Sequence, residues 1–145
     1  MNHNLAISES IDINADPSKV WDGLTNPEII KKYLSGTDTV TDWEIGSEVI
    51  FHGEYGGRHY RDGGIIKENV LEKVLSYSYW TGFSGLEDKP ENYSLITYTL
   101  ESSDNIKTKF TWSQKGFADE EKYKHAESGM QEFLETIKEV IEKSK

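Results

Sequence analysis

The sequence contains no cysteine, only three prolines and two methionines, and no long run of apolar residues. Without cysteine the chain forms no disulfide or thiolate metal site and has no cysteine nucleophile. No segment approaches the roughly 20 apolar residues of a membrane-spanning helix. The first ten residues also lack the basic start and the apolar run of a signal peptide. These features predict a soluble, cytoplasmic protein.

Basic residues are few, because 16 Lys and Arg stand against 26 Asp and Glu, which gives a net charge of −10. An acidic surface repels nucleic-acid phosphates and anionic lipid headgroups. We therefore expect no nucleic-acid or membrane partner, whereas small molecules and proteins remain candidates. The 145 residues fit one domain, 1–145, whose core requires no metal. Nothing in the sequence predicts a cofactor, and the chain is expected to be a monomer or a weak homodimer.

Two short helices are expected after a first strand. Apolar residues alternate with polar ones over residues 5–13, as in a half-buried strand. Asp16-Pro17 and Asn26-Pro27 each combine a helix-capping residue with a proline at the first helical position. Gly36 fits the end of the second helix.

From residue 40 to 112 the apolar residues recur at every second position, which is typical of β-strands. Gly56-Gly57 fits the tip of a tight hairpin, because glycine readily adopts the positive φ angles of such turns. The predicted strands are 40–43, 47–55, 59–68, 73–81, 93–101 and 106–113.

The last segment, 119–144, has apolar residues at steps of three and four, as in an amphipathic helix. It would be roughly 35–40 Å long, and the sheet is the only surface large enough to bury its apolar stripe. The sequence therefore predicts an α+β fold: a curved antiparallel sheet of about six or seven strands wrapped around a long C-terminal helix.

Short motifs follow one another along the whole chain: IDINADP at 11–17, VWD at 20–22, LTNP at 24–27, WEIGS at 43–47, GII at 64–66, LSYSY at 75–79, SGLEDKPENY at 84–93 and ITYTL at 96–100. This ordered set resembles the START-like (SRPBCC) superfamily, and within it the branch of homologues of the activator of a heat-shock chaperone ATPase. The resemblance implies the helix-grip fold with a cavity for a hydrophobic ligand.

We therefore expect a small-molecule-binding domain that holds a lipid, a polyketide-like compound or another hydrophobic or aromatic ligand. One alternative, implied by the branch name, is a co-chaperone-like domain whose partner is a heat-shock ATPase. A further alternative is a cyclase or hydrolase of a hydrophobic substrate. No GxSxG, P-loop, HExxH or EF-hand motif is present, so no catalytic residue is predicted.

Side chains on one face of the strands are expected to line the cavity with the helix, although the same pattern also fits an ordinary packed core. Trp43 and Arg58 are placed at its rim, where Arg58 would orient a ligand carboxylate or carbonyl or pair with an acidic residue. The expected ligand-binding residues are Val49, Phe51, Tyr60, Tyr77, Tyr79, Tyr98, Phe110 and Trp112 from the strands and Met130, Phe133 and Ile137 from the helix.

Two further features bear on the site. His52, Glu54 and His59 could bind a metal or relay protons, but their parity relative to Phe51 places them on the outer face of the hairpin. Gly129, in the middle of the last helix, either permits a bend or a ligand contact or lets the sheet pack closely. Relatives commonly have Gly-Trp here, whereas this chain has Met130, which suggests a roomier pocket or a different ligand.

Overall fold

The backbone alternates from a strand to two short helices, back to strands, and ends in a long helix. The computed structural model describes residues 1–104 and 106–144. The elements are β1 (Asn2–Ile13), α1 (Pro17–Thr25), α2 (Pro27–Tyr33), β2 (Asp38–Val40), β3 (Glu48–Tyr55), β4 (Arg58–Val70), β5 (Val74–Tyr79), the 3-10 turns η1 (Gly82–Ser84) and η2 (Pro90–Asn92), β6 (Ser94–Asp104), β7 (Lys107–Phe117) and α3 (Glu120–Lys143).

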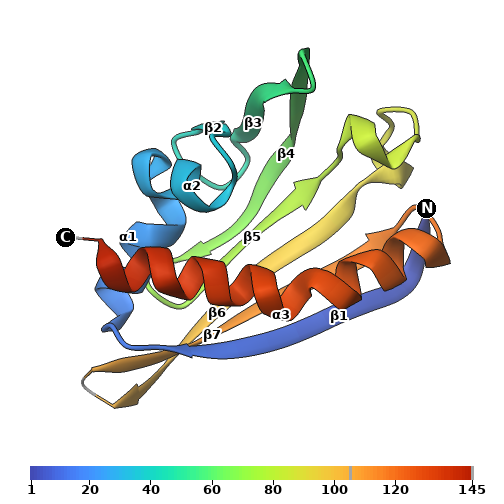
Figure 1. The fold of residues 1–145 in the computed structure, drawn as a ribbon. Helices are drawn as coiled ribbons and strands as arrows, with labels where there is room; N and C mark the ends of the chain where they lie inside the picture. The colour runs from blue at the N-terminus through green and yellow to red at the C-terminus, as the bar shows by residue number, and fades with distance from the viewer. Residues whose placement is uncertain (105, 145) are drawn as a thin grey trace.

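All seven strands belong to one antiparallel sheet in the order β1-β7-β6-β5-β4-β3-β2. Figure 1 shows that the sheet curves and that α3 crosses its concave side, with α1 and α2 over one end. The right-handed twist of a large antiparallel sheet produces such a concave face. This arrangement confirms the predicted α+β class and the helix-grip layout.

The strand predicted at 40–43 is wrong in its position, because the observed strand lies earlier in the chain. The strand β2 spans Asp38–Val40, and the chain leaves the sheet before Trp43. Trp43 has a φ angle of 66°, which a strand residue does not adopt. Its N–H donates a hydrogen bond to Thr41 Oγ1 at 3.1 Å, and the N–H of Glu44 donates to Asp42 Oδ1 at 2.9 Å. These local side-chain bonds compete with strand pairing and turn the chain.

The capping residues predicted from the sequence are confirmed. The Asp16 carboxylate accepts a hydrogen bond from the N–H of Lys19 at 2.9 Å at the start of α1, and Asn26 Oδ1 accepts one from the N–H of Glu28 at 3.0 Å at the start of α2. Each cap satisfies a backbone donor that has no partner within its helix. The two helices thus follow one another with a single residue between them.

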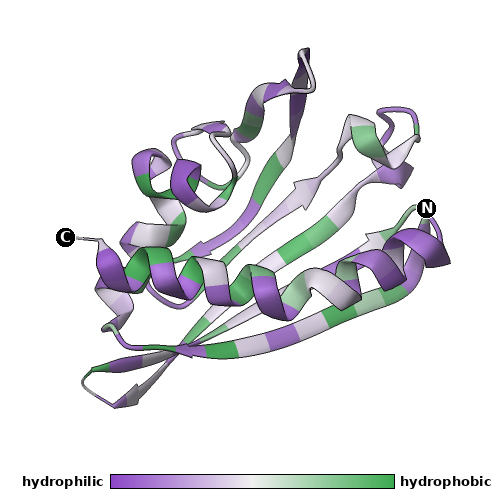
Figure 2. Ribbon diagram, in the orientation of Figure 1, coloured by the Kyte–Doolittle hydropathy of each residue, from purple (hydrophilic) through white to green (hydrophobic). Residues whose placement is uncertain are grey.

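The helix α3 buries one apolar stripe against the sheet, and Figure 2 shows its hydrophobic residues alternating with hydrophilic ones along the helix. Met130, Leu134, Ile137 and Ile141 are the buried members of the stripe. Near its end, the ammonium group of Lys138 donates to the carbonyl oxygen of Asp12 at 2.9 Å, which ties α3 to β1. None of the helices in the described residues has an apolar stretch long enough to cross a bilayer.

Candidate functional site

A cavity of about 490 Å³ lies between the concave face of the sheet and the helical layer. Strands β3 to β7 supply one wall, because every second residue of a strand points to the same face. The helices α1 and α2, with the segment that follows them, supply the other wall, and α3 adds one aromatic ring. The lining residues are Leu24, Ile30, Tyr33, Leu34, Ser35, Thr37, Trp43, Phe51, Tyr60, Asp62, Tyr77, Tyr79, Ile96, Tyr98, Trp112, Gln114 and Phe133.

Aromatic rings of the wall contact one another across neighbouring strands. The ring of Phe51 lies 5.7 Å from that of Tyr77 and 6.1 Å from that of Tyr79, and Tyr77 lies 5.8 Å from Tyr98, all measured between centroids. Most of these pairs meet edge to face, an arrangement that the ring quadrupole favours. The contacts join β3, β5 and β6 into one aromatic surface that faces the cavity.

On the helical side, Phe133 is the contact between α3 and the aromatic wall. Its ring centroid lies 6.4 Å from that of Trp112 on β7 and 6.5 Å from that of Tyr33 on α2. The Tyr33 hydroxyl donates a hydrogen bond to the carbonyl oxygen of Gly23 at 3.0 Å. Phe133 therefore touches both walls of the cavity and links α3 to the pair of short helices.

The tyrosine hydroxyls of the wall bond within the protein. Tyr77 and Tyr98 share a hydroxyl–hydroxyl bond of 2.8 Å, and Tyr60 bonds to the hydroxyl of Thr37 on the opposite wall. Burial raises the pKa of Tyr77 and of Tyr98 because it disfavours the phenolate. Both hydroxyls are thus neutral at physiological pH, and the bonds fix the orientation of their rings.

Asp62 is the one charged residue that lines the cavity in the described part of the chain. Only 7% of its surface is exposed. Its carboxylate accepts hydrogen bonds from the Tyr79 hydroxyl at 3.3 Å and from the Gly82 N–H at 3.2 Å. Burial raises the pKa of Asp62, whereas its hydrogen bonds, including one from Thr81, oppose the rise.

Seven of the expected ligand-binding residues line the cavity together, and so does Trp43, which was expected at the rim. The seven are Phe51, Tyr60, Tyr77, Tyr79, Tyr98, Trp112 and Phe133.

Val49, Phe110, Met130 and Ile137 are also buried, but they lie in the packed core outside this cavity. Their strand or helix parity is the expected one. Val49 also borders the second cleft, and Phe110, Met130 and Ile137 pack between the sheet and α3, so parity alone does not separate these four from the lining residues.

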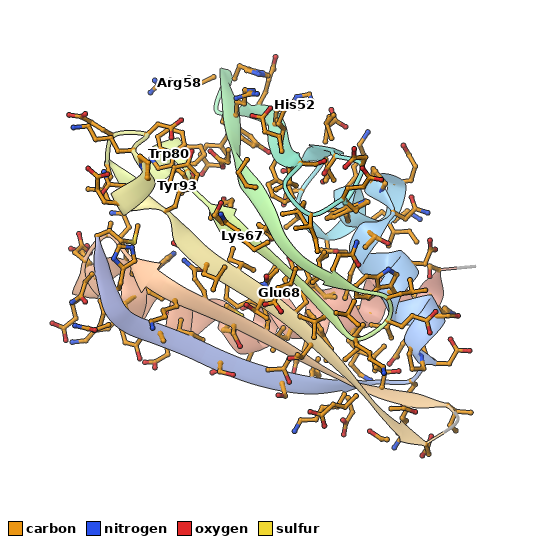
Figure 3. All side chains as sticks on the ribbon, turned by 180° about the vertical axis from the view of Figure 1, so that it is seen from behind. His52, Arg58, Lys67, Glu68, Trp80 and Tyr93 are labelled. Atoms are coloured by element: carbon orange, nitrogen blue, oxygen red, sulfur yellow. The ribbon has the colours of Figure 1, made fainter. Side chains whose placement is uncertain are left out.

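The β3–β4 hairpin projects beyond the cavity. Phe51 pairs with Asp62 and Glu54 pairs with His59, as the Gly56-Gly57 tip predicts. The rings of His52 and His59 lie 5.8 Å apart on the outer face, away from the aromatic wall. Arg58 is exposed at the tip of the hairpin, where Figure 3 shows it pointing away from the sheet. Arg58 does not line the cavity, but it borders an outer cleft together with Tyr60 and Asp62, which do.

Gly129 of α3 faces solvent. It is exposed, and a Cβ atom added there would meet no atom within 4 Å. A ligand contact and close packing of the sheet therefore do not fit this position, since no atom lies near it. Met130, the next residue, is buried but does not line the cavity.

The sequence pattern did not identify the helical wall of the cavity. Leu24, Ile30 and Tyr33 lie on the two short helices, and no periodicity tells which strands those helices cover. Asp62 could be identified from the sequence, because strand parity places it on the same face as Phe51. A carboxylate at an inward position of an otherwise apolar face is a signal for a site.

A second cleft, of about 400 Å³, lies where β4 and β5 meet near Gly63 and Gly64. A Cβ atom on Gly64 would be 1.9 Å from the carbonyl oxygen of Ser78, so glycine is required there. Trp80 and Tyr93 line this cleft, and Figure 3 shows them at one end of the sheet. It is more polar than the concave cavity and contains none of the expected ligand-binding residues except Val49.

Solved structures share this fold. A solution structure of a protein from Cytophaga hutchinsonii is 36% identical, has a TM-score of 0.82, and is matched over 98% of this chain and 97% of that chain. An HSP90 activator from Plasmodium falciparum is 14% identical, with a TM-score of 0.73 and coverage of 94% and 96%. The Aha1 dimer from Colwellia psychrerythraea is 20% identical, with a TM-score of 0.72 and coverage of 97% and 98%.

No curated protein matches the sequence significantly. Residues 14–142, however, match the family described as "Activator of Hsp90 ATPase homolog 1-like protein". That match spans most of the chain. The chain therefore belongs to the activator of Hsp90 ATPase homolog 1-like family, a branch of the START-like, helix-grip superfamily.

Proposed function

We propose that this protein binds a hydrophobic or aromatic small molecule in the cavity between the sheet and the helices. The observation that carries the proposal is a cavity of about 490 Å³ with aromatic side chains on both walls. Pockets for small organic ligands typically measure about 300–1,000 Å³ and combine a mostly apolar lining with a few polar groups. The volume and the lining of this cavity are of that kind.

The wall is also prepared in advance for a ligand. The hydroxyls of Tyr77 and Tyr98 bond to each other, and Phe133 rests between Trp112 and Tyr33. Rings held in this way lose little freedom when a ligand arrives, so less of the binding free energy is spent on ordering them. A rigid aromatic wall favours flat or branched apolar compounds that stack against it.

A matched pair of substitutions on β6 tests this proposal. Ile96 lines the cavity, whereas its neighbour Leu95 is exposed on the outer face of the sheet. Ile96→Trp adds bulk inside the cavity, and Leu95→Trp adds the same ring outside it. Lipids and aromatic polyketide-like compounds are screened by melting temperature and amide NMR shifts. Compounds that bind the native protein and the Leu95→Trp variant should bind the Ile96→Trp variant much more weakly.

Two results would contradict the proposal. One is a screen in which no compound shifts the amide signals of Tyr77, Tyr98, Trp112 or Phe133. The other is a compound whose binding is weakened equally by both tryptophan substitutions, because such a compound binds outside the cavity. Circular dichroism of both variants controls for misfolding.

A second candidate function is binding to a heat-shock chaperone ATPase, which the family name and the likeness to an HSP90 activator suggest. An aromatic surface beside the hairpin tip favours it. Tyr55 is 72% exposed and Phe83 is 59% exposed, and their ring centroids lie 5.9 Å apart, near Arg58. Tyrosine, phenylalanine and arginine are enriched at protein interfaces.

The chaperone hypothesis is separated from the first by a titration of purified Hsp90 with this protein, read as ATPase rate. Stimulation that is lost in the Tyr55→Ala/Phe83→Ala double variant and kept in the Ile96→Trp variant would support the interface. Unchanged ATPase rates at micromolar protein would remove this candidate. The small-molecule proposal would not be affected by that result.

A further inference from the structure

The ligand of the concave cavity must meet one buried carboxylate, that of Asp62. Its position follows from strand register: Asp62 pairs with Phe51 across β3 and β4, and both side chains face the cavity. The remaining lining residues in the described chain are apolar, aromatic or uncharged polar. Asp62 is therefore the lining residue that would position a charged group of the ligand.

Asp62 also borders the second cleft with Arg61 and Lys67 and an outer cleft with Arg58, but none of these basic side chains lines the concave cavity. Arg61 and Lys67 are exposed, and Figure 3 shows Lys67 on the outer face of the strand and Arg58 beyond the hairpin tip. Within residues 1–104 and 106–144, no Lys, Arg or His forms an ion pair with Asp62. A carboxylate buried without a cation is unfavourable unless a partner arrives. Among the described residues, the donors to Asp62 are the neutral groups of Tyr79, Thr81 and Gly82.

Aromatic rings flank the carboxylate. The ring of Phe51 lies 6.1 Å from that of Tyr79, whose hydroxyl bonds to Asp62, and Tyr60 lines the same end of the cavity. Rings and a carboxylate around one space are the combination that holds an ammonium group, since the ring faces attract a cation and the carboxylate accepts its hydrogen bonds.

From these contacts we infer that the cavity selects ligands that carry a protonated amine on an apolar or aromatic body. The ammonium group donates to Asp62, and the body lies against the aromatic wall. This inference rests on the proposed function and specifies its ligand class. It disfavours fatty acids and other anions, because their carboxylate would meet a like charge inside a protein of net charge −10.

Three probes with the same ring system test the selection: 2-(1-naphthyl)ethylamine, 2-(1-naphthyl)ethanol and 1-naphthylacetate. Each is titrated at pH 7.5 into the full chain, with binding measured by calorimetry and mapped by amide NMR shifts. We expect the amine to bind about tenfold or more tightly than the alcohol, which corresponds to about 1.4 kcal/mol. The acid should bind most weakly.

Asp62→Asn should remove the preference for the amine. We expect it to weaken amine binding about tenfold, to leave alcohol binding nearly unchanged, and to strengthen binding of the acid. Asp12→Asn is the matched control, because Asp12 is exposed on β1 outside the cavity. It changes net charge equally and should leave all three affinities unchanged. If Asp62→Asn misfolds, the order of the three affinities on the native chain still tests whether the cavity selects amines.

The outcomes separate this inference from the function on which it rests. If the alcohol or the acid binds in the cavity as tightly as the amine, the selection for amines is wrong and the binding function stands. The selection is equally wrong if Asp62→Asn leaves amine affinity intact. If none of the three probes shifts the cavity signals, both the inference and the aromatic-ligand proposal fail.

Discussion

Gly23 of α1 lies against Ile141 of α3 so closely that a Cβ atom on Gly23 would be 2.4 Å from Ile141 Cγ1 and 2.7 Å from Cδ1. Both residues are buried. The carbonyl oxygen of the same glycine accepts the hydrogen bond from Tyr33, a lining residue of the cavity. This contact therefore sets the distance between α3 and the helical wall of the cavity.

Gly23→Ala should lower the free energy of unfolding by about 1–3 kcal/mol, the usual cost of overpacking a dense core. The added methyl group forces Ile141 or the whole of α1 to move. Urea denaturation checks the loss of stability. Unchanged stability would show that α1 and α3 separate easily, contrary to the packing described.

Gly129→Ala is expected to have the opposite effect. Gly129 is exposed within α3 and a Cβ atom there meets nothing within 4 Å, so alanine adds helix propensity without a clash. The gain is about 1 kcal/mol, which raises Tm by roughly 3 °C in a chain of this size. Differential scanning calorimetry measures it, and a fall in Tm would mean that the helix needs glycine at this position.

The fold was predictable from the sequence because its signals are local and agree with each other. Asp16 and Asn26 cap their helices as expected, and the Gly56-Gly57 tip sets the register of β3 on β4. Trp43 shows where the approach fails. Its alternating neighbours predict a strand, but the side chains of Thr41 and Asp42 accept hydrogen bonds from the N–H groups of Trp43 and Glu44 and hold the backbone in the left-handed region. The hydrophobic period contains no sign of these bonds.

The site was predictable only in part. Parity correctly assigns Tyr77, Tyr98 and Trp112 to the inner face, yet it assigns Phe110 there equally, and Phe110 is packed in the core. Whether an inward side chain lines a space or fills one depends on what lies above it. That is decided by long-range packing of α2 and α3, which a strand pattern does not contain.

Removing either hydroxyl of the Tyr77–Tyr98 pair should cost about 1 kcal/mol, because the other hydroxyl loses its partner. Tyr77→Phe/Tyr98→Phe removes both and should cost little more than one single substitution. A double-mutant cycle by urea denaturation measures this coupling. Strictly additive losses would indicate that each hydroxyl bonds elsewhere.

Stability should depend on the ionisation of Asp62. Burial raises the pKa of Asp62 in the folded state above its ordinary value of 3.8, so the folded chain holds this proton more tightly than the unfolded chain. The stabilisation is complete below the unfolded pKa and is lost as the pH rises through the folded pKa. The unfolding free energy of the native protein minus that of Asp62→Asn should therefore fall as the pH rises above about 4.

The difference between the two proteins is the quantity to follow from pH 3.5 to 7.5, by urea denaturation. Carboxylates with a lowered pKa, such as that of Glu139 beside Lys143, titrate in both proteins and cancel. The substitution also replaces two carboxylate oxygens by one amide oxygen. This change shifts the difference in unfolding free energy by an amount that does not depend on pH. A difference that rises with pH would reverse the assignment of a raised pKa to Asp62.

The pairing of β1 with β7 has a consequence for biosynthesis. The strand β1 leaves the ribosome well before β7, the strand to which it is hydrogen-bonded, with Ile13 opposite Thr108 and Ile7 opposite Gln114. At about 5–20 residues per second, β1 waits on the order of 5–20 s for its neighbour. During that time its apolar face has no sheet to join. The apolar face of β1 is therefore exposed to misassociation until β7 and α3 emerge.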